Sequence, residues 1–151
     1  MERKSILIVD DDKEILKSLR SILQSKGYDV DTVETGEEAL EKSRAKFFHL
    51  VLLDIRLPDI EGTKLLKTMH RTLPKMMKIM LTGFASLDNA IEALNLGADA
   101  YLMKPIDPAK LLSVVEEKLK EQEQADRMTE EKVAEWIETR VRKLESKQGK
   151  R

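Results

Sequence analysis

The sequence contains no cysteine, few aromatic residues and no long apolar run, and each absence excludes a class of protein. Without cysteine, the 151-residue chain has no disulfide framework, thiolate metal site or cysteine nucleophile. Its first apolar run is too short for the core of a signal peptide, and no run approaches the ~20 residues that span a bilayer. We therefore expect a cytoplasmic protein that does not insert into a membrane.

An excess of charge of one sign is also missing. The chain has 27 Lys and Arg residues and 28 Asp and Glu residues, so its formal net charge is −1. A nucleic-acid-binding surface usually carries a clear positive excess. The composition therefore does not favour direct contact with nucleic acid.

Short apolar runs alternate along the chain with segments of helical period. This alternation is typical of a parallel sheet covered by helices on both faces. The fold that it predicts is α/β, with a doubly wound sheet of five strands and a helix after each strand. The expected strands cover residues 5–9, 28–33, 49–53, 78–82 and 99–103, and the expected helices include 86–96 and 107–121.

We expect a domain over residues 1–122 and a helical extension over residues 123–151. The extension contains no proline, and its glycine comes only near the end, so one long helix is an alternative. However, the heptad register that carries Leu112, Val115 and Leu119 then meets Gln122, Asp126 and Thr129. Three polar core positions favour a break before a separate amphipathic helix that begins near Thr129.

The apolar face of this last helix has three possible uses. It could pack on the domain, which is the commonest fate of such a stripe, or form a dimer, or bind another protein. Its residues are Val133, Trp136, Ile137, Val141 and Leu144.

Polar side chains stand at the ends of four expected strands. Asp10 and Asp11 follow the first strand, Asp54 ends the central one, and Thr82 and Lys104 end the two last strands. Because ligands bind outside the carboxyl ends of parallel strands, we expect these groups to converge. Each residue alone is equally typical of a turn or a helix cap, and only the joint pattern indicates a functional site.

Clustered carboxylates repel one another unless a proton or a cation is shared. Mg²⁺ prefers oxygen ligands, and the best candidates are Asp11 and Asp54, with the backbone carbonyl of Arg56 as a third. An ionised aspartate beside such an ion can attack phosphorus to form an acyl phosphate. Lys104 and the Thr82 hydroxyl would then bind phosphoryl oxygens.

Four motifs resemble those of the receiver domain of bacterial and archaeal two-component response regulators. They are ILIVDDD at residues 6–12, LLDIRLPDIEG at 52–62, LTG at 81–83 and AYLMKP at 100–105, and the resemblance covers residues 4–121. It implies a flavodoxin-like (βα)5 fold in which Asp54 is the phosphoacceptor and Asp10 and Asp11 are the acidic pair that binds Mg²⁺ or Mn²⁺. It also implies a cis peptide bond between Lys104 and Pro105.

The resemblance further implies a two-state switch. The phosphoryl group would pull in the Thr82 hydroxyl, Tyr101 would follow, and the output face would comprise helix 86–96, the strand through Tyr101 and helix 107–121. The implied phosphodonor is a histidine kinase or phosphotransfer protein, and the output is a protein target. A homodimer through helix 107–121 or the C-terminal helix is a further possibility.

We expect a phosphorylation-controlled binding module rather than an enzyme. A phosphatase of the haloacid-dehalogenase type would carry a second acid two positions after Asp54, where this chain has Arg56. A receiver used purely for assembly is disfavoured because every acceptor-site residue is present. The residues after the domain are too few for a winged-helix or AAA+ output domain, so the chain is either a stand-alone receiver or part of a longer regulator.

Overall fold

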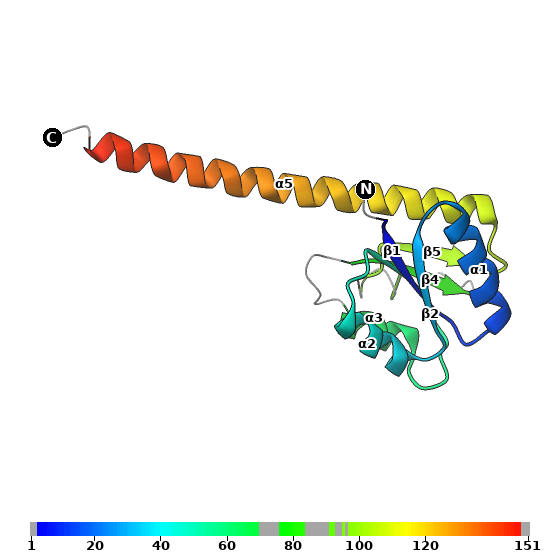
Figure 1. The fold of residues 1–151 in the computed structure, drawn as a ribbon. Coiled ribbons are helices and arrows are strands. Elements are labelled where there is room, and N and C mark those ends of the chain that lie inside the picture. Colours follow the sequence, from blue (N-terminus) through cyan, green and yellow to red (C-terminus); the bar gives the residue numbers. More distant parts are fainter. Residues whose placement is uncertain (1–2, 70–75, 84–90, 93–94, 96, 149–151) are drawn as a thin grey trace. The chain divides into compact units, whose positions relative to one another are not determined.

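A computed structural model describes residues 3–69, 76–83, 91–92, 95 and 97–148, and the chain divides into two compact units, Met1–Leu119 and Lys120–Arg151. The first unit is built on a five-stranded sheet (Figure 1). All its neighbouring strands are parallel, and their order is β2-β1-β3-β4-β5. The predicted parallel α/β sheet is therefore confirmed. Its strands are β1 (Ser5–Val9), β2 (Asp29–Val33), β3 (Leu50–Asp54), β4 (Met77–Thr82) and β5 (Ala100–Met103).

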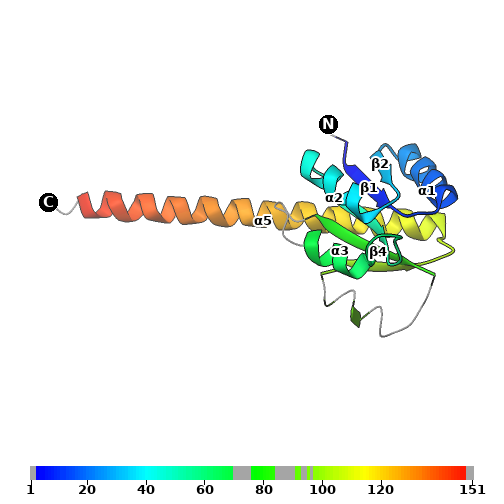
Figure 2. The same cartoon turned by 90° about the horizontal axis from the view of Figure 1, so that it is seen from below.

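Helices cover both faces of this sheet, as Figures 1 and 2 show. Alternate residues of the buried strand β1 point to opposite faces, so Ile6 and Ile8 belong to one core and Leu7 and Val9 to the other. The first core is closed by α1 (Lys13–Ser25) and by the beginning of α5 (Pro108–Gln148), and the second by α2 (Gly36–Ala45) and α3 (Gly62–Met69).

Both ends of α1 carry residues that are typical of helix caps. Asp12 is the N-cap, and its side chain accepts hydrogen bonds from the backbone N–H groups of Glu14 and Ile15. Gly27 follows the helix with φ of +88°, a conformation that favours glycine. Asp12 is thus occupied as a cap, which leaves Asp10 and Asp11 as the acids available to a site.

The predicted break before Thr129 is wrong and the alternative of one long helix is confirmed, because α5 is continuous from Pro108 to Gln148. Polar residues at positions such as Asp126 remove an apolar seam, but they do not disturb the hydrogen bonds within a helix. The segment is rich in Glu, Lys, Gln, Arg and Ala, which are strong helix formers, and nothing in it interrupts the backbone.

The apolar side chains of the second unit are exposed. Val133, Trp136, Ile137, Val141 and Leu144 each keep between 47% and 61% of their surface accessible. The predicted helix 86–96 lies mostly outside the described residues, of which Ile91, Glu92 and Asn95 are helical. Within the described part of the chain, no helix is both long and apolar enough to cross a membrane.

Candidate functional site

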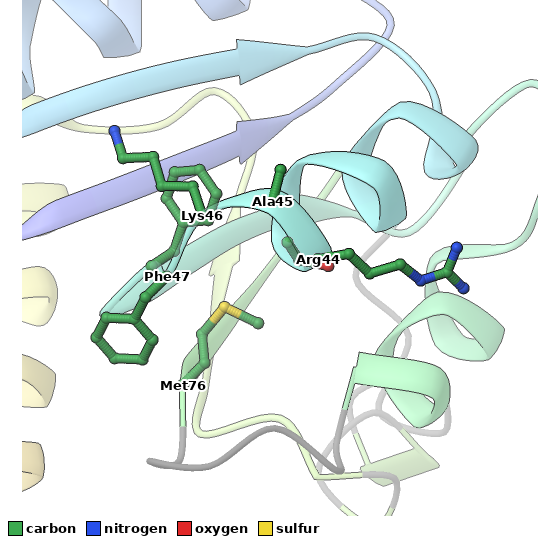
Figure 3. Close-up of a pocket in the computed structure, with 7 residues that line it drawn as sticks. Arg44, Ala45, Lys46, Phe47 and Met76 are labelled. Carbon is green, nitrogen blue, oxygen red and sulfur yellow. The ribbon is translucent and has the colours of Figure 1, made fainter.

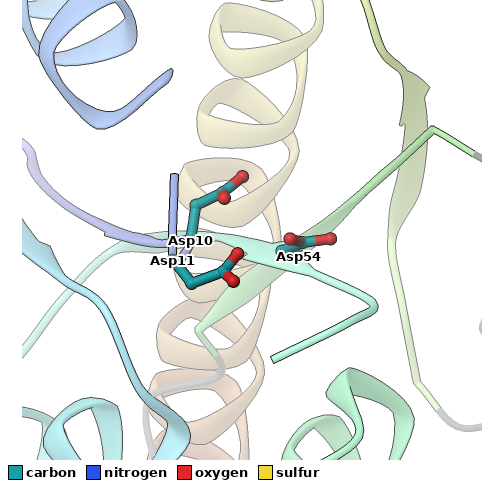
Figure 4. A group of neighbouring side chains, drawn as sticks. All are labelled: Asp10, Asp11 and Asp54. Carbon is teal, nitrogen blue, oxygen red and sulfur yellow. The ribbon is translucent and has the colours of Figure 1, made fainter. Parts of the chain in front are cut away.

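Three carboxylates meet at the carboxyl ends of the neighbouring strands β1 and β3 (Figure 4). Asp10, Asp11 and Asp54 each offer one oxygen, and these oxygens all lie within 4.8 Å of one another. Asp10 and Asp54 are buried, whereas Asp11 is exposed. The convergence predicted from the strand ends is therefore present, and one member of the cluster faces solvent.

Lys104 places an ammonium group between two of these acids. Its Nζ lies 2.8 Å from Asp10 Oδ2 and 3.3 Å from Asp54 Oδ2, and its side chain is only 20% exposed. Burial acts to lower the pKa of Lys104, but the interactions with Asp10 and Asp54 outweigh it and the pKa is raised. Lys104 therefore carries a charge that partly neutralises the cluster.

Asp10 presents one oxygen that accepts no hydrogen bond. Its Oδ1 accepts a bond of 2.9 Å from the backbone N–H of Asp12. Its buried Oδ2 has no hydrogen-bond partner within the described structure, and the Lys104 ammonium lies 2.8 Å away as its counter-ion. One ammonium group cannot neutralise the three carboxylates of this cluster, so negative charge remains there. With two further carboxylates nearby, the residues present fit a Mg²⁺ ion, which prefers oxygen ligands.

Asp54 is held in one orientation. Its Oδ1 accepts a hydrogen bond of 3.2 Å from the backbone N–H of Arg56, and its Oδ2 faces Lys104. Burial raises the pKa of the Asp54 carboxyl, and the charge of Asp10 adds to this, while the bonds from Arg56 and Lys104 oppose it. Because the rise prevails, the ionised form of Asp54 is under electrostatic strain that a bound cation would relieve.

The loop after β3 returns tightly against the strand. The backbone N–H of Gly62 donates a hydrogen bond of 2.7 Å to the carbonyl of Ile55. A Cβ atom on Gly62 would overlap the carbonyl oxygen of Asp54, so only glycine allows this approach. The loop between these residues carries Arg56, whose carbonyl is a predicted metal ligand.

Asp59 fixes the outer part of the same loop. Its two carboxylate oxygens accept hydrogen bonds of 2.9 Å from the backbone N–H groups of Gly36 and Glu37, at the beginning of α2. These bonds hold the pKa of Asp59 below its usual value. The role of Asp59 could not be predicted from the sequence, because an aspartate in a turn is common and its partners here are backbone groups of another element.

Thr82 and Tyr101 lie on the two adjoining strands. Thr82 ends β4 and is buried, and its carbonyl accepts a hydrogen bond of 2.7 Å from the backbone N–H of Lys104. Tyr101 is half-buried on β5 beside the second core. The Lys104–Pro105 peptide bond is cis, as the resemblance implied. The structure thus brings the predicted hydroxyl to the same edge of the sheet as the carboxylates.

A cavity of about 650 Å³ adjoins Lys104. It lies between α1 and the segment that follows β5, and its lining includes Ile15, Leu19 and Ile106. A second cavity, of about 320 Å³, is lined by residues 43–48 and Met76 (Figure 3). This second cavity lies before β3 and β4 in the chain, at the opposite ends of these strands from Asp54, and it contains none of the predicted site residues.

Comparison with known proteins identifies the family. The family model described as "Response regulator receiver domain" matches residues 6–116. The chain belongs to the response regulator receiver family. Receiver domains are phosphoacceptor switch modules of two-component systems that bind Mg²⁺ at an acidic pocket and interact with histidine kinases or phosphotransfer proteins.

Curated relatives extend well beyond the receiver. The transcriptional regulatory protein ZraR of Klebsiella oxytoca is 41% identical over 118 residues, which cover 78% of this chain and 27% of ZraR. The cell cycle response regulator CtrA of Brucella ovis is 31% identical over 108 residues, 72% of this chain and 47% of CtrA. The chain therefore spans between about a quarter and a half of these relatives.

Solved structures confirm the receiver fold. A CheY-like receiver domain protein from Methanospirillum hungatei is 52% identical, with a TM-score of 0.79 over 82% of this chain and 99% of that one. The chemotaxis protein CheY4 of Vibrio cholerae is 30% identical, with a TM-score of 0.73 over 77% of this chain and 98% of that one. The predicted family and fold class of this receiver are both confirmed.

Proposed function

We propose that this receiver accepts a phosphoryl group on Asp54 from the phosphohistidine of a histidine kinase or phosphotransfer protein. The observation that carries the proposal is the position of the buried Asp54 carboxylate, which lies beside both an ammonium group and an acidic pair. Family membership makes phosphoryl acceptance the expected chemistry for such a site.

In the transfer, Asp54 Oδ2 forms a bond to phosphorus while the bond from phosphorus to the donor nitrogen breaks and leaves its electron pair on that nitrogen. Oδ2 is the better candidate oxygen, because Oδ1 accepts the Arg56 N–H and Oδ2 lies 3.3 Å from Lys104 Nζ. The Lys104 ammonium then pairs with one phosphoryl oxygen, and the Thr82 hydroxyl donates to another.

Asp10, Asp11, Asp54 and the Arg56 carbonyl are the residues that would hold Mg²⁺ or Mn²⁺. When bound, the ion supplies neutralisation of the phosphoryl charge. The excess of three carboxylates over the one Lys104 ammonium supports this assignment. Arg56 would act through its backbone carbonyl, so a substitution of its side chain would leave this metal ligand in place.

We further infer that phosphorylation is communicated through Thr82 and Tyr101 to a protein-binding face. That face would comprise helix 86–96, strand β5 and residues 107–121, and its occupant would be a downstream protein. The cavity beside Lys104 is the proposed docking place of the phosphodonor, since it opens next to the group that binds the transferred phosphate. Two-component signalling through this receiver would then need no enzyme activity beyond the phosphorylation and dephosphorylation of Asp54.

Intact-mass measurement after incubation with acetyl phosphate tests the assignment. We expect a gain of one phosphoryl mass that requires Mg²⁺ and that is lost in Asp54→Asn. Asp12→Asn is the matched control, because Asp12 caps α1 and is not assigned to the site. Labelling that persists in Asp54→Asn, or that needs no divalent cation, would contradict the proposal.

A further inference from the structure

The second unit of the chain carries an apolar seam in a heptad register. Ala134, Ile137, Val141 and Leu144 follow one another at spacings of three, four and three residues, which is the alternation of the a and d positions of a coiled coil. All four side chains are exposed within one helix. This register differs from the one through Leu112, Val115 and Leu119, which fails at polar residues, so the seam begins only at Ala134.

The two flanks of this seam differ in charge. The e positions next to it are all acidic, namely Glu131, Glu138 and Glu145. The g positions on the other side are Val133 and Arg140. The Arg140 guanidinium lies 4.9 Å from the centre of the Trp136 ring, an arrangement that keeps the positive charge on this flank.

The charges at the e and g positions favour one orientation of a helix pair over the other. In a parallel pair, the e flank of one helix faces the g flank of the other, so Arg140 of each copy would lie near Glu145 of its partner. In an antiparallel pair, flanks of the same kind face each other, so glutamates would oppose glutamates. The segment is therefore complementary to a second copy of itself in one direction only.

We propose that residues 134–145 form a parallel, in-register coiled coil with the same residues of a second copy of this chain. A helix from an unrelated protein would need both the apolar spacing and the inverted charge pattern, whereas a second copy supplies both. Since the segment follows the receiver unit in the chain, a parallel pair brings together the two helix ends to which the two receiver units are attached. Because the seam has only four apolar positions, we expect a weak dimer that forms at high protein concentration.

Sedimentation equilibrium of the full chain, up to about 1 mM, measures this association. We expect a monomer–dimer equilibrium whose dissociation constant rises about tenfold or more in Leu144→Glu, because the substitution places a charge in the seam. Met128→Glu is the matched control: Met128 is an equally exposed apolar residue of the same helix, but it lies at an outer b position. A chain that stays monomeric, or equal effects of the two variants, would overturn the proposal.

The absence of cysteine allows a direct test of orientation. In Ala134→Cys the two introduced thiols of a parallel in-register pair come within disulfide range, whereas in an antiparallel pair they lie at different heights. We expect a covalent dimer under mild oxidation, and far less from Met128→Cys. A dimer that is sensitive to Leu144→Glu but not cross-linked through residue 134 would refute the parallel orientation. Acetyl-phosphate labelling of each variant reports separately that its receiver unit is folded.

Discussion

Replacing Lys104 by methionine removes the ammonium group that lies against Asp10 and Asp54 in the acidic cluster. Methionine keeps much of the length of the side chain and deletes the charge. Asp10 would then be buried with an oxygen that has neither a hydrogen bond nor a counter-ion. We therefore expect the free energy of unfolding to fall in the absence of divalent cations.

The magnitude follows from the burial of the pair. Breaking a fully buried ion pair costs about 3–5 kcal/mol, because one charge stays behind without compensation. Lys104 is 20% exposed and Asp11 opens the cluster to solvent, which moves the expected loss to about 2–3 kcal/mol.

Lys46→Met is the matched control. Lys46 Nζ also contacts two carboxylates at similar distances, 3.0 Å to Asp29 and 3.3 Å to Asp31, but its side chain is 41% exposed. Exposed pairs contribute about 0.2–1 kcal/mol, so Lys46→Met should cost less than ~1 kcal/mol. The contrast between the two variants isolates the effect of burial.

Urea denaturation at pH 7, with and without Mg²⁺, measures both effects. Mg²⁺ should narrow the gap in the free energy of unfolding between Lys104→Met and the parent protein, because the more negative site of the variant binds the ion more tightly. At saturating Mg²⁺, each tenfold gain in affinity narrows the gap by about 1.4 kcal/mol. Equal losses in Lys104→Met and Lys46→Met, or a gap that Mg²⁺ leaves unchanged, would refute the reasoning.

Two further predictions concern other carboxylates. Asp54→Asn should raise the free energy of unfolding at pH 7 without Mg²⁺, because burial raises the pKa of the Asp54 carboxyl in the folded state. The stability that this carboxyl contributes is present at low pH and is lost as the pH rises through its folded-state pKa. In urea denaturation from pH 4 to 8, the difference in the free energy of unfolding between Asp54→Asn and the parent protein should become smaller as the pH falls. A difference that does not change with pH would contradict the raised pKa as its cause. Asp59→Ala should weaken Mg²⁺ binding about tenfold by calorimetry, because the loop that carries Arg56 loses its attachment to α2. Asp59→Asn, which keeps one acceptor, should lose less, and unchanged affinity in Asp59→Ala would exclude a positioning role.

The grouping of the site residues could be predicted because the strands of a parallel sheet all point the same way, so that their carboxyl ends share one edge. Once β1, β3, β4 and β5 are recognised from their apolar runs, Asp10, Asp54, Thr82 and Lys104 must lie at one edge. The spacing of these residues in sequence carries this information, and the structure bears out their proximity.

Other features depend on contacts that no side-chain pattern records. Asp59 binds backbone N–H groups at the start of α2, and the nearer of these is 22 residues away in sequence. The prediction of a break before Thr129 is wrong for a different reason: a heptad pattern indicates whether a helix has a partner, not whether its own hydrogen bonds continue. The apolar register through Ala134 and the one through Leu112 differ, and both lie in a single unbroken helix.

The distance in sequence between Lys104 and Asp54, 50 residues, has a consequence for folding. Parallel pairings connect strands through long crossovers, and such non-local contacts form late and slowly. A chain whose last strand has not yet docked presents its acids without the ammonium. Under the proposed function, the site could accept phosphate only once β5 has joined the sheet, so a nascent or partly unfolded chain would not be phosphorylated.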